Sequence, residues 1–316
     1  MKLKKLIFYL FPAVALASCS AVYEDLDPCP QGADVSLTFT RNMENKDLYD
    51  SQVDCAKLLL FDKNDDFYGE YDYTEGRTLS LELPVGDYKA IVYGGMSCDN
   101  TSFFFTSAPG PGLKYHEVET YLAGTRAAES AADLHDHFHG LGAFSVEKDD
   151  MTHRPVTVDL TKNTNRFNVS LSYSDNSAIN ASEYSVELTA DNSVSNHENS
   201  VKPQGAHVIY RPHGVDTDGK TLAAHLSTPR LTDDPTSRLI VRRAGQKDPV
   251  VNISLIQYIE KIHKEALPGA SLQEYLDRED TWNFEFKLEP DANDEMHISL
   301  TFKINDWTVI INKWDL

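Results

Sequence analysis

RFNVSLSY, residues 166–173, is the stretch that decides the fold. Phe167, Val169, Leu171 and Tyr173 are apolar or aromatic, and polar residues stand between them. Alternate side chains of a β-strand point to the same face of the sheet, so this period of two predicts a strand with one buried face and one solvated face. Such alternation is typical of antiparallel sheets that pack into two-layer sandwiches.

The same alternation recurs along the chain. It is present in VSLTF (35–39), TLSLEL (78–83), VTVDL (156–160), YSVELT (184–189), WNFEFKL (282–288), HISLTFKI (297–304) and WTVII (307–311). Turn-forming residues separate these segments, as in EPDANDE at 289–295. Helical patterns are scarce, and the two best cover 256–267 and 271–280, where Ser271 and Glu274 form a capping box. Many short strands with turns between them predict an all-β fold with short helices.

The N-terminus has the order of an export signal that ends in a lipidation site. MKLKKLIFYLFPAVALASCS begins with a basic segment and continues with an apolar run over 6–16, which is too short to span a bilayer. LASC, 16–19, has the small residues and the cysteine of a bacterial lipobox, whose thiol takes the diacylglycerol. An ordinary secretory signal is the alternative. We expect a lipoprotein signal peptide over 1–18, lipid on Cys19, and a lipidated tether over 19–33.

The remaining length predicts two domains. Removing the signal peptide leaves 298 residues, which is more than one sandwich usually needs. The polar stretch TKNTN, 161–165, has an alternating strand on either side and is the expected seam. We therefore expect an N-terminal β-sandwich over residues 34–160 and a C-terminal β-sandwich over residues 161–316.

Charge and motif content exclude several classes of function. The formal net charge is −20, and loss of the three lysines of the signal peptide makes it −23. A chain this acidic repels the phosphates of nucleic acids. No later stretch has the ~18 apolar residues of a membrane helix. The signatures of serine hydrolases, zinc proteases and P-loop enzymes do not occur in the sequence. We expect a non-enzymatic protein without a cofactor, held at a membrane by its lipid.

Three cysteines follow Cys19 in the exported chain, and a disulfide is permitted in that compartment. Three is an odd number, so at most one bridge forms within the chain. We expect the bridge between Cys29 and Cys55, which leaves Cys98 free. Three buried free thiols are the alternative.

Residues 132–146, ADLHDHFHGLGAFSV, hold three histidines in five positions. On a strand, His135, His137 and His139 would share one face, and a strand-borne His-x-His pair is able to chelate zinc. The alternative is a histidine-rich strand or loop with a structural role.

Four stretches carry a resemblance to a known family. They are YEDLDPCPQG (23–32) after the lipobox, QVDCAKLLLFDKNDDFYGEY (52–71), LQEYLDREDTWNFEFKL (272–288) and INDWTVIINKWDL (304–316). In this order they resemble the FimB-type fimbrial anchor lipoproteins of Bacteroidales, relatives of the fimbrillin subunits. The "YLDRE" run within the third stretch is the most specific of these features.

The resemblance implies two tandem transthyretin-like antiparallel β-sandwiches and a non-enzymatic subunit. Such a subunit anchors a fimbria to the outer membrane through its lipid and regulates fimbrial assembly, with fimbrillin shaft or accessory subunits as partners. The three histidines match no metal motif of the family. We therefore expect no metal, with His135 packed and with His137 and His139 partly exposed.

Two further functions compete with the anchor. One is a surface adhesin or tip lipoprotein that binds a glycan or a host ligand on the same scaffold. The other is a metal-dependent enzyme that uses the histidines.

The mode of joining a partner is also open. An extended segment added to a sheet edge is the expected mode. Trp307, Val309 and Ile311 form a terminal apolar row able to occupy a groove, and they are the candidate strand-exchange segment. The alternative is that this segment pairs within its own second domain, which is the commoner fate.

Overall fold

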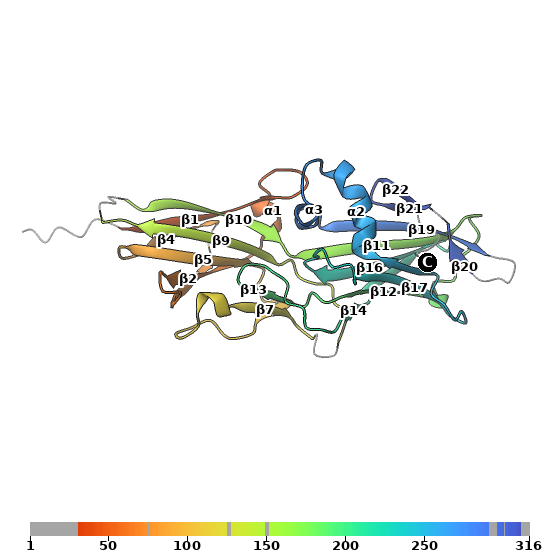
Figure 1. The fold of residues 1–316 in the computed structure, drawn as a ribbon, viewed down its shortest axis with the longest axis horizontal. Coiled ribbons are helices and arrows are strands. Elements are labelled where there is room, and N and C mark those ends of the chain that lie inside the picture. The colour runs from red at the N-terminus through yellow and green to blue at the C-terminus, as the bar shows by residue number, and fades with distance from the viewer. Residues whose placement is uncertain are drawn as a thin grey trace, which may run out of the picture.

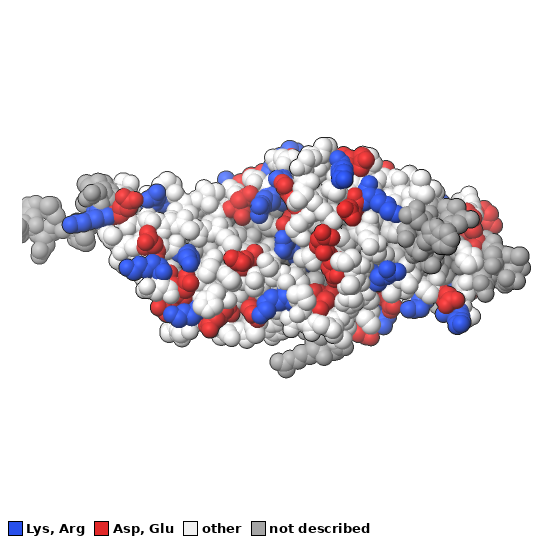
Figure 2. All heavy atoms as spheres, viewed as in Figure 1, with Lys and Arg blue, Asp and Glu red and all other residues white. Residues whose placement is uncertain are grey.

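The computed structural model describes residues 31–74, 76–124, 128–148, 152–290, 296–299 and 301–310. The molecule is elongated, with two β-rich halves end to end along its longest axis (Figure 1). Acidic and basic side chains are mixed over the face drawn in Figure 2. The predicted all-β class is confirmed, and the assignment of each half to the transthyretin-like type stays a prediction. The lipidation site predicted at Cys19 lies outside the described residues.

In the described part of the first half, seven strands form one sheet with the order β3-β2-β5-β9-β10-β1-β4. Their bounds are β1 Gly32–Arg41, β2 Ala56–Asp62, β3 Phe67–Tyr73, β4 Thr78–Glu82, β5 Gly86–Gly94, β9 Phe138–Val146 and β10 Arg154–Lys162. Val35, Leu58 and Val158 are fully buried in one cluster that these strands share. The Tyr73 hydroxyl donates to the Val35 carbonyl at 3.3 Å, which joins β3 to β1 although the two are not neighbours in the sheet. The sheet therefore folds over its own core.

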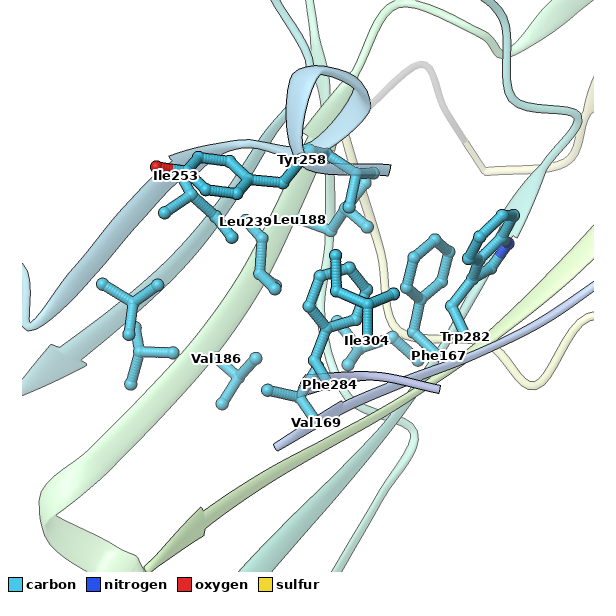
Figure 3. Close-up of a cluster of buried hydrophobic side chains, with 14 of the residues drawn as sticks. Phe167, Val169, Val186, Leu188, Leu239, Ile253, Tyr258, Trp282, Phe284 and Ile304 are labelled. Atoms are coloured by element: carbon cyan, nitrogen blue, oxygen red, sulfur yellow. The ribbon is translucent and has the colours of Figure 1, made fainter. Parts of the chain in front are cut away.

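Two sheets face each other in the described part of the second half, with the orders β15-β16-β11-β19-β21-β22 and β18-β17-β12-β14-β8, and β20 lies beside β19. The first contains β11 Thr164–Tyr173, β15 Gly214–Thr217, β16 Thr221–Pro229, β19 Thr281–Pro290, β20 Met296–Ile298, β21 Thr301–Ile304 and β22 Trp307–Ile310. The second contains β8 Glu129–Ser130, β12 Tyr184–Ala190, β14 Val208–Tyr210, β17 Arg238–Arg243 and β18 Val251–Ser254. Phe167 and Phe284 of the first sheet share a core with Leu188 and Leu239 of the second (Figure 3). RFNVSLSY thus forms β11, an inner strand of its sheet.

Some pairings are parallel, which the antiparallel prediction missed. β1 pairs with β10, β11 with β19, and β8 with β14, all in the parallel sense. The paired strands lie far apart in the chain, so the connections are long enough to return the chain in the same direction. A half-buried strand has the same period of two whether its pairing is parallel or antiparallel. The alternation of apolar and polar residues alone therefore does not distinguish the two kinds of pairing.

The two predicted helices are confirmed as α2 Leu255–Ala266 and α3 Leu272–Arg278. The Ser271 hydroxyl accepts from the Glu274 N–H at 3.1 Å, as a helix N-cap does. Helix α2 buries Ile256, Tyr258 and Ile259 against the core of the second half. Among the described residues, three short helices were not predicted: α1 Tyr49–Gln52, η1 Tyr115–Glu117 and η3 Ala181–Glu183. Within the described ranges, no helix has the length and apolar character needed to cross a membrane.

A long excursion between β5 and β9, residues 95–137, connects the two halves, and we call it the strap. It carries β6 Phe103–Phe105, η1 and β7 Glu119–Leu122, as well as β8. Strand β7 pairs with β13, Val194–Asn196, and β8 pairs with β14, both in the second half. On the other side, Val118 of the strap shares a core cluster with Phe61 and Tyr93 of the first sheet. Strand pairing therefore crosses the expected boundary at residue 160.

Candidate functional site

The linker between β10 and β11 is buried where the two halves meet. Only Asn163 separates the two strands. Asn163, Thr164 and Asn165 are 2, 0 and 2% exposed. The Asn163 N–H donates to the His137 carbonyl at the end of the strap, at 2.6 Å. The polar TKNTN stretch is therefore packed and hydrogen-bonded to its surroundings.

Buried amides hold this linker to the second half. The amides of Asn163 and Asn199 bond to each other in both directions, at 2.7 and 3.0 Å. The Trp282 indole N–H donates to Asn165 Oδ1 at 3.0 Å, and Asn165 Nδ2 donates to the Pro229 carbonyl at 3.3 Å. A buried polar group is costly unless it has a partner, so each of these contacts resists displacement of the linker.

Ion pairs connect the strands next to the linker, the strap and Asp280, the residue before β19. The Lys162 side chain is 8% exposed, and its ammonium lies 2.9 Å from Asp136 and 2.8 Å from Asp280. Asp136 also pairs with Arg166 at 3.0 Å, and Arg166 contacts Asp133 at 2.6 Å. Lys162 is the buried member of this network, so loss of Asp136 or Asp280 would leave its ammonium less well compensated, which is destabilising. The network therefore opposes separation of the two halves.

Arg230 connects the segment that carries Asn199 to helix α3. Its guanidinium donates to both carboxylate oxygens of Asp277, at 2.7 and 2.8 Å. It also donates to the Asn199 carbonyl. The planar guanidinium matches the carboxylate in this two-bond geometry, which gives directional as well as electrostatic stabilisation.

The predicted partial exposure of two histidines is wrong, because aromatic rings of the strap and of β5 pack against them. His137 is 2% exposed and His139 is 4% exposed. The His137 ring stacks on Phe103 of the strap at 4.3 Å and on Tyr93 of β5 at 5.9 Å between ring centroids. A ring nitrogen of His139 lies 3.0 Å from the His197 carbonyl. Burial lowers the pKa of His137 to about 3 and that of His139 to about 4, so both rings are neutral near pH 7.

The three histidines do not share one strand face. Strand β9 begins at Phe138, so His135 and His137 precede it on the strap. Among the described residues, no group of three or more His, Cys, Asp or Glu side chains is placed to hold a metal ion. The segment instead packs the strap against the linker, since the His137 N–H donates to Thr164 Oγ1 at 3.0 Å.

The predicted Cys29–Cys55 bridge is replaced by Cys55–Cys98, with 5.8 Å between the Cα atoms. Cys55 immediately precedes β2 and Cys98 follows β5. These two strands pair antiparallel with Ala56 opposite Gly94, which brings the two cysteines together. Cys29 lies outside the described residues. The bridge fastens the first turn of the strap to the first sheet.

The candidate strand-exchange segment forms an edge of the second half. Residues 307–310 pair with β21 as strand β22, and Ile311 lies outside the described residues. Val309 is 3% exposed, whereas Trp307 and Ile310 are 37% and 67% exposed. In the described chain β22 is the last strand of its sheet, so it has a neighbour on one side.

Sequence reasoning missed the amide and ion-pair network of the junction. The only local signal was the run of Asn163, Thr164 and Asn165 directly before an apolar strand. Polar residues at that position fit an exposed turn equally well. Their partners Asn199 and Trp282 come from distant parts of the chain, so the strand pairings had to be known first.

Comparison with known proteins identified one matching family and several solved structures with a similar fold. The model of a family described as "Fimbrillin-A associated anchor proteins Mfa1 and Mfa2" matches residues 26–313. No curated protein matches the chain.

Three solved structures show the same fold. A "putative adhesin" from Bacteroides thetaiotaomicron is 29% identical, with a TM-score of 0.79 over 91% of this chain and 100% of its own. The fimbrial anchor protein Mfa2 from Porphyromonas gingivalis is 14% identical, with a TM-score of 0.71 over 90% of this chain and 100% of its own. A structure from Bacteroides thetaiotaomicron described as "putative polysaccharide binding proteins" is 23% identical, with a TM-score of 0.78 over 90% and 99%.

Proposed function

The chain belongs to the family of fimbrillin-A associated anchor proteins, and on this premise we propose that it is a lipid-anchored, non-enzymatic subunit that holds a fimbria at the outer membrane and regulates its assembly. The observation that carries the proposal is the family match over residues 26–313, which covers nearly the whole chain after the signal peptide. We further propose that the halves are two transthyretin-like sandwiches, over residues 34–160 and 161–316.

The proposed attachment point is the lipid on Cys19, with residues 19–33 as the tether. Strand β1 begins at Gly32, and it lies in the half opposite to β19 and β20 (Figure 1). A lipid at this end leaves the second half directed away from the membrane. This orientation suits a subunit that presents its far half to a fimbria.

An anchor must carry force from its tether to its partner, and the strand order supports such a path. Strand β1, next to the tether, is hydrogen-bonded to β10, and β10 continues through Asn163 into β11. Strand β11 is in turn paired with β19. A pull on the tether is thereby spread over two ladders of main-chain hydrogen bonds. The buried junction adds side-chain contacts at the point where the halves meet.

We propose the edge formed by β22 as the place where a fimbrillin subunit joins. Strand addition uses main-chain hydrogen bonds for affinity and alternate side chains for specificity. The exposed side chains of Trp307 and Ile310 lie on this edge strand. An open strand edge is able to pair with other chains until its proper partner binds. Binding of the fimbrillin subunit at this edge is therefore a step at which fimbrial growth is regulated.

The test is complementation of a deletion strain with Cys19→Ala, with Cys29→Ala as the matched cysteine control. Wild type and Cys29→Ala should restore membrane-attached protein and cell-bound fimbriae. The Cys19→Ala protein should be exported and folded, yet absent from outer membranes after a salt wash, with fimbriae released into the medium. Retention of Cys19→Ala protein and fimbriae on the membrane contradicts the lipid anchor. Unchanged fimbriae in the deletion strain contradict the anchoring role itself.

A further inference from the structure

A pocket of about 710 Å³ opens beside the three-stranded sheet β13-β7-β6, in which β6 and β7 belong to the strap. One face of this sheet is directed into the protein, where Phe103 and Leu122 are buried in the core of the second half. The opposite face lines the pocket with Phe104 and Tyr121. Further lining comes from Lys202, Gln204, Ala206 and His207, which precede β14, and from Val208 at its start. The pocket is within the size range of small-molecule sites.

Two neighbouring aromatic rings, inclined by 38° to each other, line this pocket, and we call them the platform. Phe104 and Tyr121 are directly opposite each other on β6 and β7, with 6.1 Å between ring centroids. Phe104 is 43% exposed. A single exposed ring is common on protein surfaces, so the ring alone points to no ligand. Here, however, the Phe104 ring lies in a pocket that also holds polar side chains, and this combination points to a ligand.

The polar side chains of the pocket are arranged without a net charge. Lys202 contacts Glu119 as an ion pair, and both line the pocket. Gln204 also lines it, and its side-chain amide donates to the Lys202 carbonyl at 2.7 Å. The pocket therefore offers carboxylate, ammonium and amide groups beside two aromatic rings, and a compensated pair attracts neither anions nor cations strongly.

We propose that this pocket binds a neutral pyranose unit of a polysaccharide. A pyranose ring has an apolar face of C–H groups and a rim of hydroxyls. The C–H face carries partial positive charge and complements the negative face of an aromatic ring such as Phe104. The hydroxyls both donate and accept hydrogen bonds, which suits Glu119, Lys202 and Gln204. The net charge of −20 disfavours acidic sugars by long-range repulsion.

A peptide strand fits this surface less well. Strand β6 is the edge of its sheet, but the outward main-chain groups of Phe103 are already in contact with a side chain. The Phe103 N–H donates to Thr101 Oγ1 at 3.3 Å, and Thr101 Oγ1 donates to the Phe103 carbonyl at 3.2 Å. An added strand would have to displace these contacts. The proposed glycan site does not depend on the anchoring role, so a result that contradicts one proposal leaves the other unaffected.

The test measures binding of the purified protein to two probes. One is an array of neutral and sialylated or uronic-acid glycans, and the other is polysaccharide extracted from the surface of the producing cells. Two variants remove the platform: Phe104→Ala, and Phe104→Leu, which keeps an apolar side chain without a flat ring. Tyr68→Ala is the control, because Tyr68 is similarly exposed, at 42%, but lies on β3 in the other half.

We expect the wild-type protein to bind a neutral glycan on at least one probe and to leave the acidic glycans unbound. Both Phe104 variants should lower the affinity by about tenfold or more, since loss of one well-placed aromatic contact has this size. Gln204→Ala should also weaken binding, and Tyr68→Ala should not change it. Binding to the array identifies an external glycan, and binding to the extract alone identifies the cell's own polysaccharide. Absence of neutral-glycan binding on both probes, or unchanged binding by Phe104→Leu, overturns the proposal.

Discussion

Asn163 and Asn199 bond amide to amide across the junction, with Asn163 Nδ2 2.7 Å from Asn199 Oδ1 and Asn199 Nδ2 3.0 Å from Asn163 Oδ1. Asn163 joins β10 to β11, and Asn199 follows β13, which pairs with the strap. Both side chains are buried. This pair therefore couples the linker of the two halves to the segment on which the strap is fixed.

Asn163→Ala should lower the free energy of unfolding by about 1–3 kcal/mol, because it leaves the buried Asn199 amide without its partner. Asn199→Gly is the reciprocal variant, since the backbone φ of 64° at Asn199 suits glycine. If the two amides interact as the distances indicate, the double variant should cost less than the sum of the single variants. Chemical denaturation measures all three values.

Asn176→Gly is the control for the backbone change, because Asn176 is exposed and has a φ of 58°. It should change stability by no more than about 0.5 kcal/mol. Strictly additive losses at Asn163 and Asn199 would contradict the coupling.

Loss of the Cys55–Cys98 disulfide should destabilise the protein by about 2–4 kcal/mol, because the bridge closes a loop between residues separated by 43 positions. The measurement is the unfolding midpoint of Cys55→Ala and of Cys98→Ala. Peptide mapping of the wild type without reduction should recover Cys55 linked to Cys98. Cys29→Ala should leave both the bridge and the midpoint unchanged. A peptide that links Cys29 to Cys55 is the result that would reject this pairing.

Acid should destabilise the junction through its buried histidines. The pKa of His137 in the folded protein is about 3, below the value of about 6.5 expected for an unfolded chain. The unfolded state therefore takes up protons first as the pH falls below about 6.5, and the stability from the neutral ring is progressively lost down to about pH 3. Between pH 6.5 and 4 this loss amounts to at most about 3 kcal/mol for one histidine.

His137→Phe should make the fall in stability between pH 7 and 4 less steep, because phenylalanine retains the stacking on Phe103 and Tyr93 and does not titrate. His116→Asn, at an exposed position, should follow the wild-type profile. Thermal unfolding across this pH range gives the comparison. If the stability of the wild type and that of His137→Phe fell equally steeply with pH, His137 would not contribute to the acid sensitivity.

Glu279 should have the opposite pH dependence. Burial raises its pKa to about 7, although the Thr281 N–H donates to it at 3.2 Å. A raised carboxyl pKa means that its contribution is fully present below about pH 4.5 and is lost as the pH rises through about 7. Glu279→Gln should therefore make the protein relatively more stable at pH 8 than at pH 5, compared with wild type. If Glu279→Gln and the wild type showed the same change in free energy of unfolding between pH 5 and pH 8, the raised pKa of Glu279 would be contradicted.

Deletion of residues 307–316 should lower the free energy of unfolding by about 2 kcal/mol or more, since Val309 is buried and β22 pairs with β21, which carries the buried Phe302 and Ile304. Deletion of 311–316 alone is the matched control and retains β22. If the strand is structural, only the longer deletion unfolds the second half. If it exchanges, the longer deletion stays folded while fimbriae detach or change length. A truncated protein that is both stable and fully able to hold fimbriae contradicts both alternatives.

Local patterns were enough to predict much of the fold. The alternation in RFNVSLSY placed Phe167, Val169 and Leu171 in a core, and all three are buried there. The Ser271 capping signal located the start of α3. The resemblance to fimbrial anchor lipoproteins, drawn from four short stretches, is confirmed by the family match. These features depend on residues that are close together in the chain, so they are recognisable in a single sequence.

Only the tertiary structure decided which distant residues meet. Parallel pairing of β1 with β10, the Cys55–Cys98 bridge and the burial of His137 against Phe103 and Tyr93 all depend on segments far apart in the chain. A period of two is the same in parallel and antiparallel sheets, and a cysteine or histidine has no local mark of its partner. The energy of such contacts comes from desolvation and geometry at the point of contact, and these are set when the halves pack together.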